Sequence, residues 1–143
     1  HDALPIFELI FEPEADLPLV LASYDHLQGV WLNLLLNAVD AIDDNAGTIK
    51  VVTKSHGSEI RVIVIDTGKG MPQEQVSRIF EPFFTTKEAG EGTGLGLSIV
   101  REIVQVHGGR ISFGRSQSLG GFAASVELPN PRENSVRGLS DIG

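Results

Sequence analysis

The stretch Thr48–Asp66 reads TIKVVTKSHGSEIRVIVID and contains two runs rich in β-branched residues. Such runs favour strands, and the first alternates apolar and polar side chains as a strand with one buried face does. The residues His56–Ser58 between the runs include a glycine, which is a hairpin signal. The stretch therefore predicts two adjacent strands, Thr48–Lys54 and Glu59–Asp66. The second is almost wholly apolar and is expected to be buried.

Further elements are predicted on both sides of this hairpin. Additional strands are expected at Leu4–Phe11, Arg110–Arg115 and Phe122–Leu128. Helices are expected at Asp25–Asp44, Gln73–Ile79 and Leu95–His107. Because strands follow one another directly at two places, the order favours an α+β fold over alternating βαβ units. The expected architecture is a two-layer sandwich of one mixed, mostly antiparallel sheet with helices on one face.

Length and composition indicate one globular domain. The chain has 143 residues, of which 41% are hydrophobic and 21% charged, within the ordinary range for globular proteins. No apolar run approaches the roughly 18 residues that a membrane span needs, and no signal peptide is visible. Cysteine is absent, which excludes disulfides and thiolate zinc sites. Residues 1–129 are expected to form the domain, followed by a polar, disordered tail at 130–143.

Charge is distributed unevenly along the chain. Residues 1–49 contain nine acids and no Lys or Arg, and the net charge of the whole chain is −8. This pattern disfavours nucleic-acid binding, which normally uses a basic face. An anionic substrate would have to be held by local groups such as backbone amides, a metal ion or a few basic side chains.

The long helix predicted at Asp25–Asp44 has two distinct sides. Its apolar arc comprises Leu27, Val30, Trp31, Leu34, Leu35, Ala38 and Ile42. The opposing stripe comprises His26, Asn33, Asn37, Asp40 and Asp44. Two carboxamides and a carboxylate within two turns would provide oxygen ligands for a hard cation such as Mg²⁺. An ordinary solvated polar face is the alternative interpretation.

Two glycine-rich segments follow. The first is Asp66–Met71. Asp66 emerges at the end of a buried strand, where its carboxylate could accept a hydrogen bond from an exocyclic amine. Gly68 and Gly70 would let the backbone approach a flat ring. A strand-end turn with an Asx cap is the alternative. In the second, Gly90–Ser98 runs into a helix and would offer free amides to an anion. The alternative there is a plain glycine hinge.

Four motifs in order resemble the catalytic, ATP-binding domain of two-component sensor histidine kinases. They are Asn33–Ile42 (NLLLNAVDAI), Asp66–Met71 (DTGKGM), Phe80–Lys87 (FEPFFTTK) and Gly92–Ser98 (GTGLGLS). This family belongs to the GHKL, or Bergerat-fold, ATPases, which include type II topoisomerases and chaperones. The resemblance covers about Leu4 to Pro129. The phenylalanine-rich motif with Lys87 is typical of the kinase branch.

The resemblance implies specific roles for the matching residues. Asn37 would coordinate Mg²⁺ that bridges the ATP phosphates, with Asn33 beside it, and these two are the expected catalytic residues. Asp66 would accept a hydrogen bond from the adenine amino group. Phe80–Gly92 would form a mobile lid over the nucleotide. The full expected ATP-binding set is Asn33, Asn37, Asp40, Asp66, Gly68, Gly70, Met71, Phe80, Thr86, Lys87, Gly92, Thr93, Gly94, Leu95, Gly96 and Leu97.

Two features depart from the family pattern. No helix pair with a phosphoacceptor histidine is visible, so the chain is expected to bind Mg·ATP but not to autophosphorylate alone. The acceptor would lie on a separate dimerisation domain of the same kinase, and a response regulator would be reached through the full kinase. Asp40 occupies a position that is basic in many kinases.

The domain itself is expected to be monomeric and cytoplasmic, without contact to membrane or nucleic acid.

Other functions remain open at this point. A self-sufficient ATPase of the topoisomerase or chaperone type would need a Glu as general base where this chain has Asn33, a carboxamide that cannot take a proton at neutral pH. A non-catalytic nucleotide-binding regulatory module and a serine kinase of the anti-sigma type are the remaining alternatives. His26, His56 and His107 are expected to be structural or surface residues.

Overall fold

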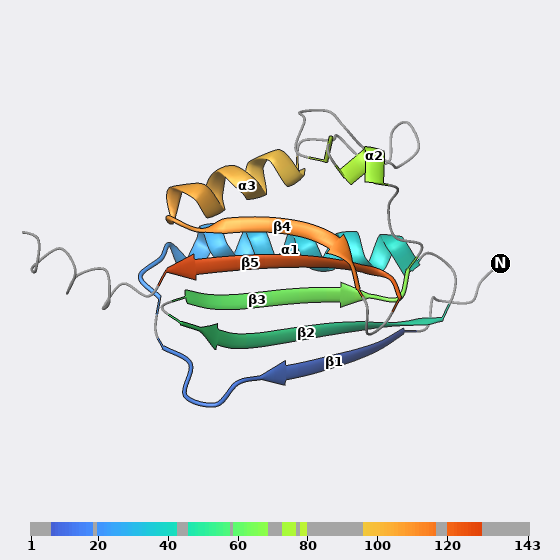
Figure 1. Cartoon of the computed structure of the whole chain (residues 1–143), viewed down its shortest axis with the longest axis horizontal. Coiled ribbons are helices and arrows are strands. Elements are labelled where there is room, and N and C mark those ends of the chain that lie inside the picture. Colours follow the sequence, from blue (N-terminus) through green and yellow to red (C-terminus); the bar gives the residue numbers. More distant parts are fainter. Residues whose placement is uncertain are drawn as a thin grey trace, which may run out of the picture.

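Among the residues that the structure describes, five strands form a single mixed sheet with the order β1-β2-β3-β5-β4 (Figure 1). The computed structural model describes residues 7–18, 20–42, 46–57, 59–68, 73–76, 78–79, 96–116 and 120–129. The strands are β1 (Phe7–Pro13), β2 (Gly47–His56), β3 (Glu59–Asp66), β4 (Arg110–Arg115) and β5 (Phe122–Pro129). Of these described strands, β1 and β2 pair in parallel, and the other neighbours pair antiparallel. The predicted fold class, with its mostly antiparallel mixed sheet, is confirmed.

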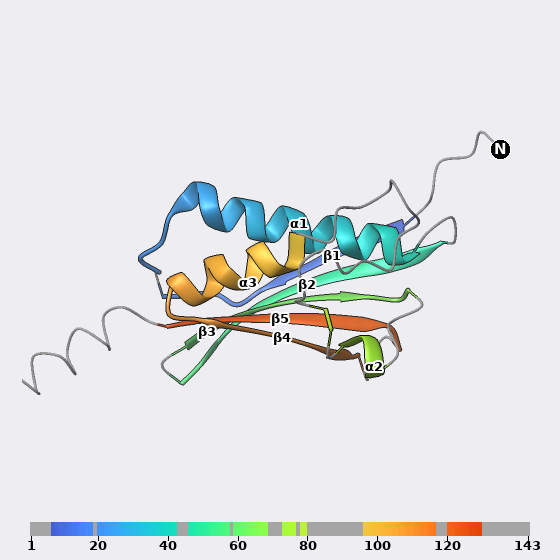
Figure 2. The same cartoon turned by 90° about the horizontal axis from the view of Figure 1, so that it is seen from above.

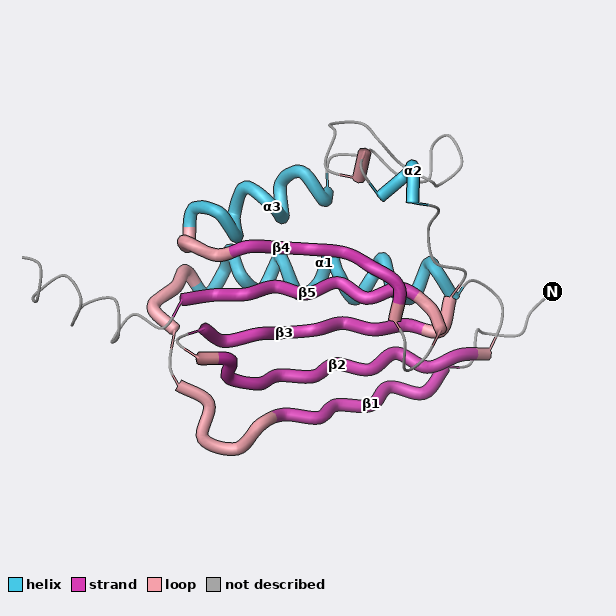
Figure 3. The backbone as a smooth tube through the Cα atoms, in the orientation of Figure 1, coloured by secondary structure: helices cyan, strands magenta, loops and turns pink. Residues whose placement is uncertain are grey.

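The central hairpin of β2 and β3 forms as predicted. Its register runs from Ile49 opposite Asp66 to His56 opposite Glu59. Gly57 has a φ of 60° at the turn, a conformation that glycine adopts without steric cost. Strand β2 continues two residues beyond the predicted Lys54, because pairing with β3 persists to the turn (Figure 3).

Strand β1 ends later than predicted. The sequence predicts its end at Phe11, but the strand continues to Pro13. Parallel pairing with β2 extends to Pro13 opposite Thr53, and the Glu14 amide donates to the Thr53 carbonyl at 2.9 Å. Proline is tolerated here because it ends an edge strand.

Two helices cover one face of the sheet side by side (Figure 2). Helix α1 (Tyr24–Ile42) packs on β2 and β3, and α3 (Gly96–Val106) packs on α1 and β4. Ser23 is the N-cap of α1, since its hydroxyl accepts from the His26 amide at 3.4 Å. Helix α2 (Gln73–Val76) is shorter than predicted, because a turn follows at 78–79.

Two glycines end helix α3 where the sequence predicted. Gly108 has a φ of 78°, and its amide donates to the Gln105 carbonyl at 2.9 Å. The Gly109 amide reaches back to the Val104 carbonyl at 2.9 Å. This pair of bonds is a Schellman motif, which satisfies carbonyls at the helix end. The chain then enters β4 directly.

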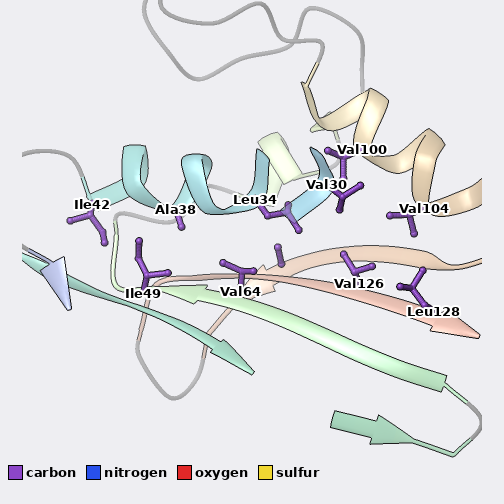
Figure 4. Close-up of a cluster of buried hydrophobic side chains, with 11 residues drawn as sticks. Val30, Leu34, Ala38, Ile42, Ile49, Val64, Val100, Val104, Val126 and Leu128 are labelled. Carbon is purple, nitrogen blue, oxygen red and sulfur yellow. The ribbon is translucent and has the colours of Figure 1, made fainter. Parts of the chain in front are cut away.

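The core lies between α1, α3 and the sheet (Figure 4). Four residues of the predicted apolar arc of α1 are buried, and the other three are half-buried against the same core: Val30, Leu34, Ala38 and Ile42, then Leu27, Trp31 and Leu35. The arc prediction is therefore confirmed. Among the described residues, no helix is long and apolar enough to cross a membrane.

Candidate functional site

A buried carboxylate ends the central strand β3. Asp66 is only 4% exposed, and one of its carboxylate oxygens, Oδ1, accepts from the Gly68 amide at 2.8 Å. Burial raises the pKa of Asp66, while hydrogen bonds from the Gly68 and Phe122 amides oppose that rise. No described Lys or Arg contributes to this balance. The structure thus contains the Asx-type turn that the sequence left as an alternative, built on a carboxylate kept largely from solvent.

Close backbone approaches hold this strand end in place. A Cβ added at Gly121 would lie 1.9 Å from the Asp66 carbonyl oxygen, and one added at Gly68 would lie 2.5 Å from the Ala41 carbonyl oxygen. Only glycine fits such contacts. The end of α1, the start of β5 and the Asp66 turn therefore meet without side chains between them. Gly68, predicted to make room for a ligand ring, is also required for packing against α1.

Thr67 fastens the same turn to the start of β2. Its hydroxyl accepts from the Thr48 amide at 2.9 Å, and its own amide donates to the Thr48 carbonyl at 3.1 Å. A Cβ at Gly47 would lie 2.6 Å from the Thr67 hydroxyl oxygen. These contacts fix the backbone that follows Asp66.

Asn33 of α1 faces the start of α3. Asn33 and Asn37 are half-buried, and a Cβ added at Gly96 would lie 2.6 Å from Asn33 Oδ1. Gly96 is the first residue of α3, so the Asn33 carboxamide lies at a helix N-terminus with its unpaired amides. A solvated polar face, the alternative interpretation of this stripe, does not describe these two residues. It does fit Asp40, which is exposed and interacts with another group.

The described residues therefore bring three predicted features to one side of the fold. These are the α1 asparagines, the Asp66 turn and the start of α3. Leu97 is half-buried and packs against the core. The predicted ligand-binding residues Gly70, Met71, Phe80, Thr86, Lys87, Gly92, Thr93, Gly94 and Leu95 lie outside the described residues, as does Asp44. So do the expected lid and the expected tail.

Two structural features, one in this region and one at the opposite end of the helices, are not predicted by the sequence. Gly120 and Gly121 before β5 indicate only a turn in the sequence, whereas Gly121 approaches the Asp66 backbone directly. His107 links the two helices, because its Nε2 accepts from the Ser23 amide at 3.1 Å and its Nδ1 lies 2.7 Å from the Ile103 carbonyl oxygen. The donor at Ser23 requires an unprotonated Nε2, so Nδ1 carries the proton. His107 is structural, as expected, and His26 is a surface residue.

The donor chemistry is consistent with a hard cation bound together with phosphate. Within the described part of the chain, no cluster of three or more His, Cys, Asp or Glu residues could hold a metal ion by itself. Carboxamide oxygens from Asn33 and Asn37 suit Mg²⁺, which usually completes its shell with phosphate oxygens and water. The gap that glycine leaves at position 96 lies directly against one of these carboxamides.

Comparison with known proteins gives the family. Residues 22–132 match the family model described as histidine kinase-, DNA gyrase B-, and HSP90-like ATPase. The chain belongs to this ATPase family. It is 42% identical over 113 residues to the sensor histidine kinase ZraS of Escherichia coli K12, an alignment that covers 79% of this chain and 24% of ZraS. The chain thus spans about a quarter of that relative's length.

Solved structures place this ATPase domain among the histidine kinases. The nucleotide-free catalytic domain of histidine kinase ThkA is similar, with a TM-score of 0.76, 36% identity, and coverage of 87% of this chain and 79% of that one. ThkA in complex with the response regulator protein TrrA gives a TM-score of 0.72 and 32% identity, covering 87% of this chain and 34% of that one. The chain is an ATPase-family catalytic domain of the sensor histidine kinase type, as the four motifs predicted.

Proposed function

We propose that this domain binds Mg·ATP and donates the γ-phosphoryl group to a histidine on a separate phosphoacceptor domain of the same kinase. The observation that supports this most directly is the contact between Asn33 and Gly96. It puts a carboxamide against the N-terminus of a helix. Helix N-termini attract phosphate, and carboxamides are ligands for Mg²⁺.

Asp66 would bind the adenine end of the nucleotide. Its carboxylate is buried at the end of β3 and has no described cationic partner. A buried acceptor in this setting favours a neutral donor such as an exocyclic amine, because an unpaired buried polar group is costly. Gly70, Met71 and Thr93 would complete this end of the pocket.

Asn37 and Asn33 would hold the phosphate end. When bound, Mg²⁺ would neutralise negative charge on the phosphate oxygens. Asn37 would provide one ligand to it, and Asn33 would orient the phosphates toward the free amides at the start of α3. Lys87 and the amides of Gly92–Gly96 would reach the same phosphates, and the segment Phe80–Gly92 would close over them.

The transfer would proceed in line. A nitrogen of the acceptor imidazole would form a bond to the γ-phosphorus while the bond to the β–γ bridging oxygen breaks, and ADP would leave. Positioning and charge neutralisation provide most of the catalysis in such reactions. Asn33 stands where the ATPase relatives need a general base, and a carboxamide cannot take a proton from water at neutral pH. Slow hydrolysis by the domain alone is therefore part of the proposal.

Partners of the complete kinase follow from the same proposal. The ThkA–TrrA complex supports a response regulator as the protein that receives the phosphoryl group from the phosphohistidine. We expect the catalytic domain to act in the cytoplasm as a monomeric unit, with dimerisation provided by the acceptor domain.

Calorimetry with a non-hydrolysable ATP analogue tests nucleotide binding. The domain should bind the analogue only with Mg²⁺, and Asp66→Ala should abolish binding. Asp25→Ala is the matched control, because Asp25 is an exposed acid in the first turn of α1, away from the site. No binding by the unaltered domain at millimolar analogue would contradict the proposal.

Phosphotransfer to a supplied acceptor domain tests the chemistry. Asn37→Ala should lose transfer, and full transfer by that variant would refute the metal role. Steady ATP turnover by the domain alone, lost in Asn33→Ala, would instead favour the self-sufficient ATPase.

A further inference from the structure

Strand β1 forms one edge of the sheet that the structure describes. It has a neighbouring strand on one side only, which is β2 (Figures 1 and 3). The outer side of an edge strand carries main-chain N–H and C=O groups that its own sheet does not pair, and another strand can bind to them. The outer side of β1 therefore offers a row of main-chain groups to a partner.

The hydrogen bonds to β2 show which residues of β1 point to this outer side. The Glu14 amide, directly after β1, donates to the Thr53 carbonyl of β2 at 2.9 Å. Successive N–H groups of a strand point to opposite edges, so the even-numbered residues of β1 also donate to β2. The N–H groups of Leu9 and Phe11 consequently point outward. Pro13 has the same orientation, and its missing N–H leaves the pairing with β2 intact.

The side chains at these two outward positions are apolar and exposed. Leu9 lies opposite Ile49, which is buried under the helices. Phe11 lies opposite Val51, which packs against the same core. Both side chains therefore point to the helical side of the sheet, yet they are 61% and 62% exposed. An added strand would cover them best with apolar side chains of its own on that side.

The other face of β1 carries two acids. Glu8 and Glu12 alternate with the apolar residues and therefore point away from the helices. Glu12 forms an ion pair with Lys50 at 3.2 Å. Glu8 is exposed and has no ion-pair partner among the described residues. A residue that an added strand places opposite Glu8 lies on this same face, where a basic side chain is favoured.

A second copy of this chain fits the edge poorly. If two β1 strands paired antiparallel with Leu9 opposite Phe11 of the other copy, Glu8 would lie opposite Glu12 of that copy. Like charges directly opposite each other destabilise a strand pair. The net charge of −8 adds to the repulsion between copies. A different segment, with basic residues where this chain has acids, fits better.

We propose that the outer edge of β1 binds an extended partner segment in which apolar residues alternate with Lys or Arg. The segment would add a strand antiparallel to β1, since antiparallel pairing is slightly more stable per residue. Its apolar residues would lie opposite Leu9 and Phe11 and exchange main-chain hydrogen bonds with them. Its basic residues would lie on the other face, one of them opposite Glu8. Main-chain bonds provide the affinity of such complexes, and the alternating side chains provide the specificity.

Short peptides in which lysine and valine alternate provide the probe. A reference peptide has glutamate at every lysine position, and two others carry N-methyl groups on all valine amides or on all lysine amides. Binding is followed by amide chemical shifts of the isotope-labelled domain. The lysine peptide should bind about tenfold more tightly than the glutamate peptide. Methylation of the valine amides should abolish binding, because these amides face β1, whereas methylation of the lysine amides should weaken it far less.

Hydrogen exchange identifies the amides that receive the partner. In the free domain the amides of Leu9 and Phe11 should exchange faster than those of Ile10 and Glu12, which donate to β2. Saturating lysine peptide should slow exchange at Leu9 and Phe11 about tenfold or more. Exchange in β4, the other edge of the described sheet, should not change. Slowed exchange in β4 instead of β1 would overturn the proposal.

Variants of β1 separate the main-chain and side-chain contributions. Leu9→Pro removes one outward N–H, and the fold should persist as it does with Pro13; binding should weaken about tenfold or more. Leu9→Thr keeps the N–H and should weaken binding less. Glu8→Gln should remove most of the preference for lysine over glutamate. Val106→Gln, at a position 79% exposed on α3, should change nothing.

Three results would overturn the proposal. The first is unaltered affinity of folded Leu9→Pro, with folding checked by denaturant titration. The second is binding that survives methylation of the valine amides, a result that does not depend on any variant folding. The third is a dimer of the domain alone, seen in sedimentation, that Leu9→Pro removes, because the edge would then belong to a second copy.

Discussion

Gly96 offers the sharpest test of how α1 and α3 cooperate. Its substitution by alanine would put a Cβ 2.6 Å from Asn33 Oδ1 and 3.5 Å from Asn33 Cγ, and the three nearest atoms all belong to that side chain. Ordinary van der Waals contact begins at 3.4 Å, so the carboxamide oxygen must move by about 0.8 Å. A side-chain end can rotate away without shifting the backbone. The fold should therefore persist while the carboxamide leaves its place.

The expected magnitudes separate stability from binding. Alanine in place of glycine favours a helix by roughly 0.5–1 kcal/mol, and an off-rotamer side chain costs about the same. The free energy of unfolding should thus change by less than about 1 kcal/mol. A hydrogen bond or ligand contact to a charged group contributes about 1.5–3 kcal/mol. The Kd for the Mg²⁺ complex of an ATP analogue should therefore rise by roughly 10- to 100-fold.

Calorimetry for binding and denaturant unfolding for stability check both numbers. Gly29→Ala is the matched control, because it lies in α1 and a Cβ there would have nothing within 4 Å. It should stabilise the domain slightly and leave affinity unchanged. If Gly96→Ala bound the analogue with unaltered affinity, Asn33 would not hold the phosphates. If it unfolded the domain, the contact would be structural.

Three further outcomes are expected. Burial raises the pKa of Asp66, so the folded state keeps that proton to higher pH than the unfolded state does. The free energy of unfolding of the natural domain, measured by denaturant titration relative to Asp66→Asn, should therefore fall as pH rises through that raised pKa. A relative increase in the free energy of unfolding over that pH range would refute this. Gly121→Ala should cost about 2–3 kcal/mol in the same titrations, because its Cβ would meet backbone at 1.9 Å, whereas Gly114→Ala, with open space around it, should cost less than half as much. His107→Ala should cost about 1–3 kcal/mol and speed hydrogen exchange at the Ser23 amide, which loses its acceptor; unchanged exchange there would show that this bond contributes nothing.

Local patterns predicted most of the fold because they encode local structure. The Thr48–Asp66 hairpin and the apolar arc of α1 follow from periodicity and turn residues alone, and Gly108–Gly109 ends α3 where expected. Asp66 was identified both as a turn former and as a buried acceptor. Its turn is present in the structure, and its contact with adenine remains a prediction.

What the sequence did not predict depends on contacts between distant residues. Ser23 and His107 are 84 residues apart, and no local pattern indicates that an imidazole will accept from that amide. Gly121 looks like any turn glycine until β5 is placed against β3. The true end of β1 at Pro13 is decided by its pairing with Thr53, across the crossover through α1.

The hydrogen bond between Ser23 and His107 holds the C-terminal end of α3, so a rotation of this helix would displace mainly its N-terminal end. Its C-terminal end is tied to the N-cap of α1 by the hydrogen bond from the Ser23 amide, and at its other end Gly96 lies against the Asn33 side chain. The eleven residues of α3 span about 16 Å, so a rotation of the helix by about 5° about its His107 end would displace Gly96 by about 1.4 Å. Small rotations at one end of the domain would thus be amplified at the end proposed to hold the phosphates.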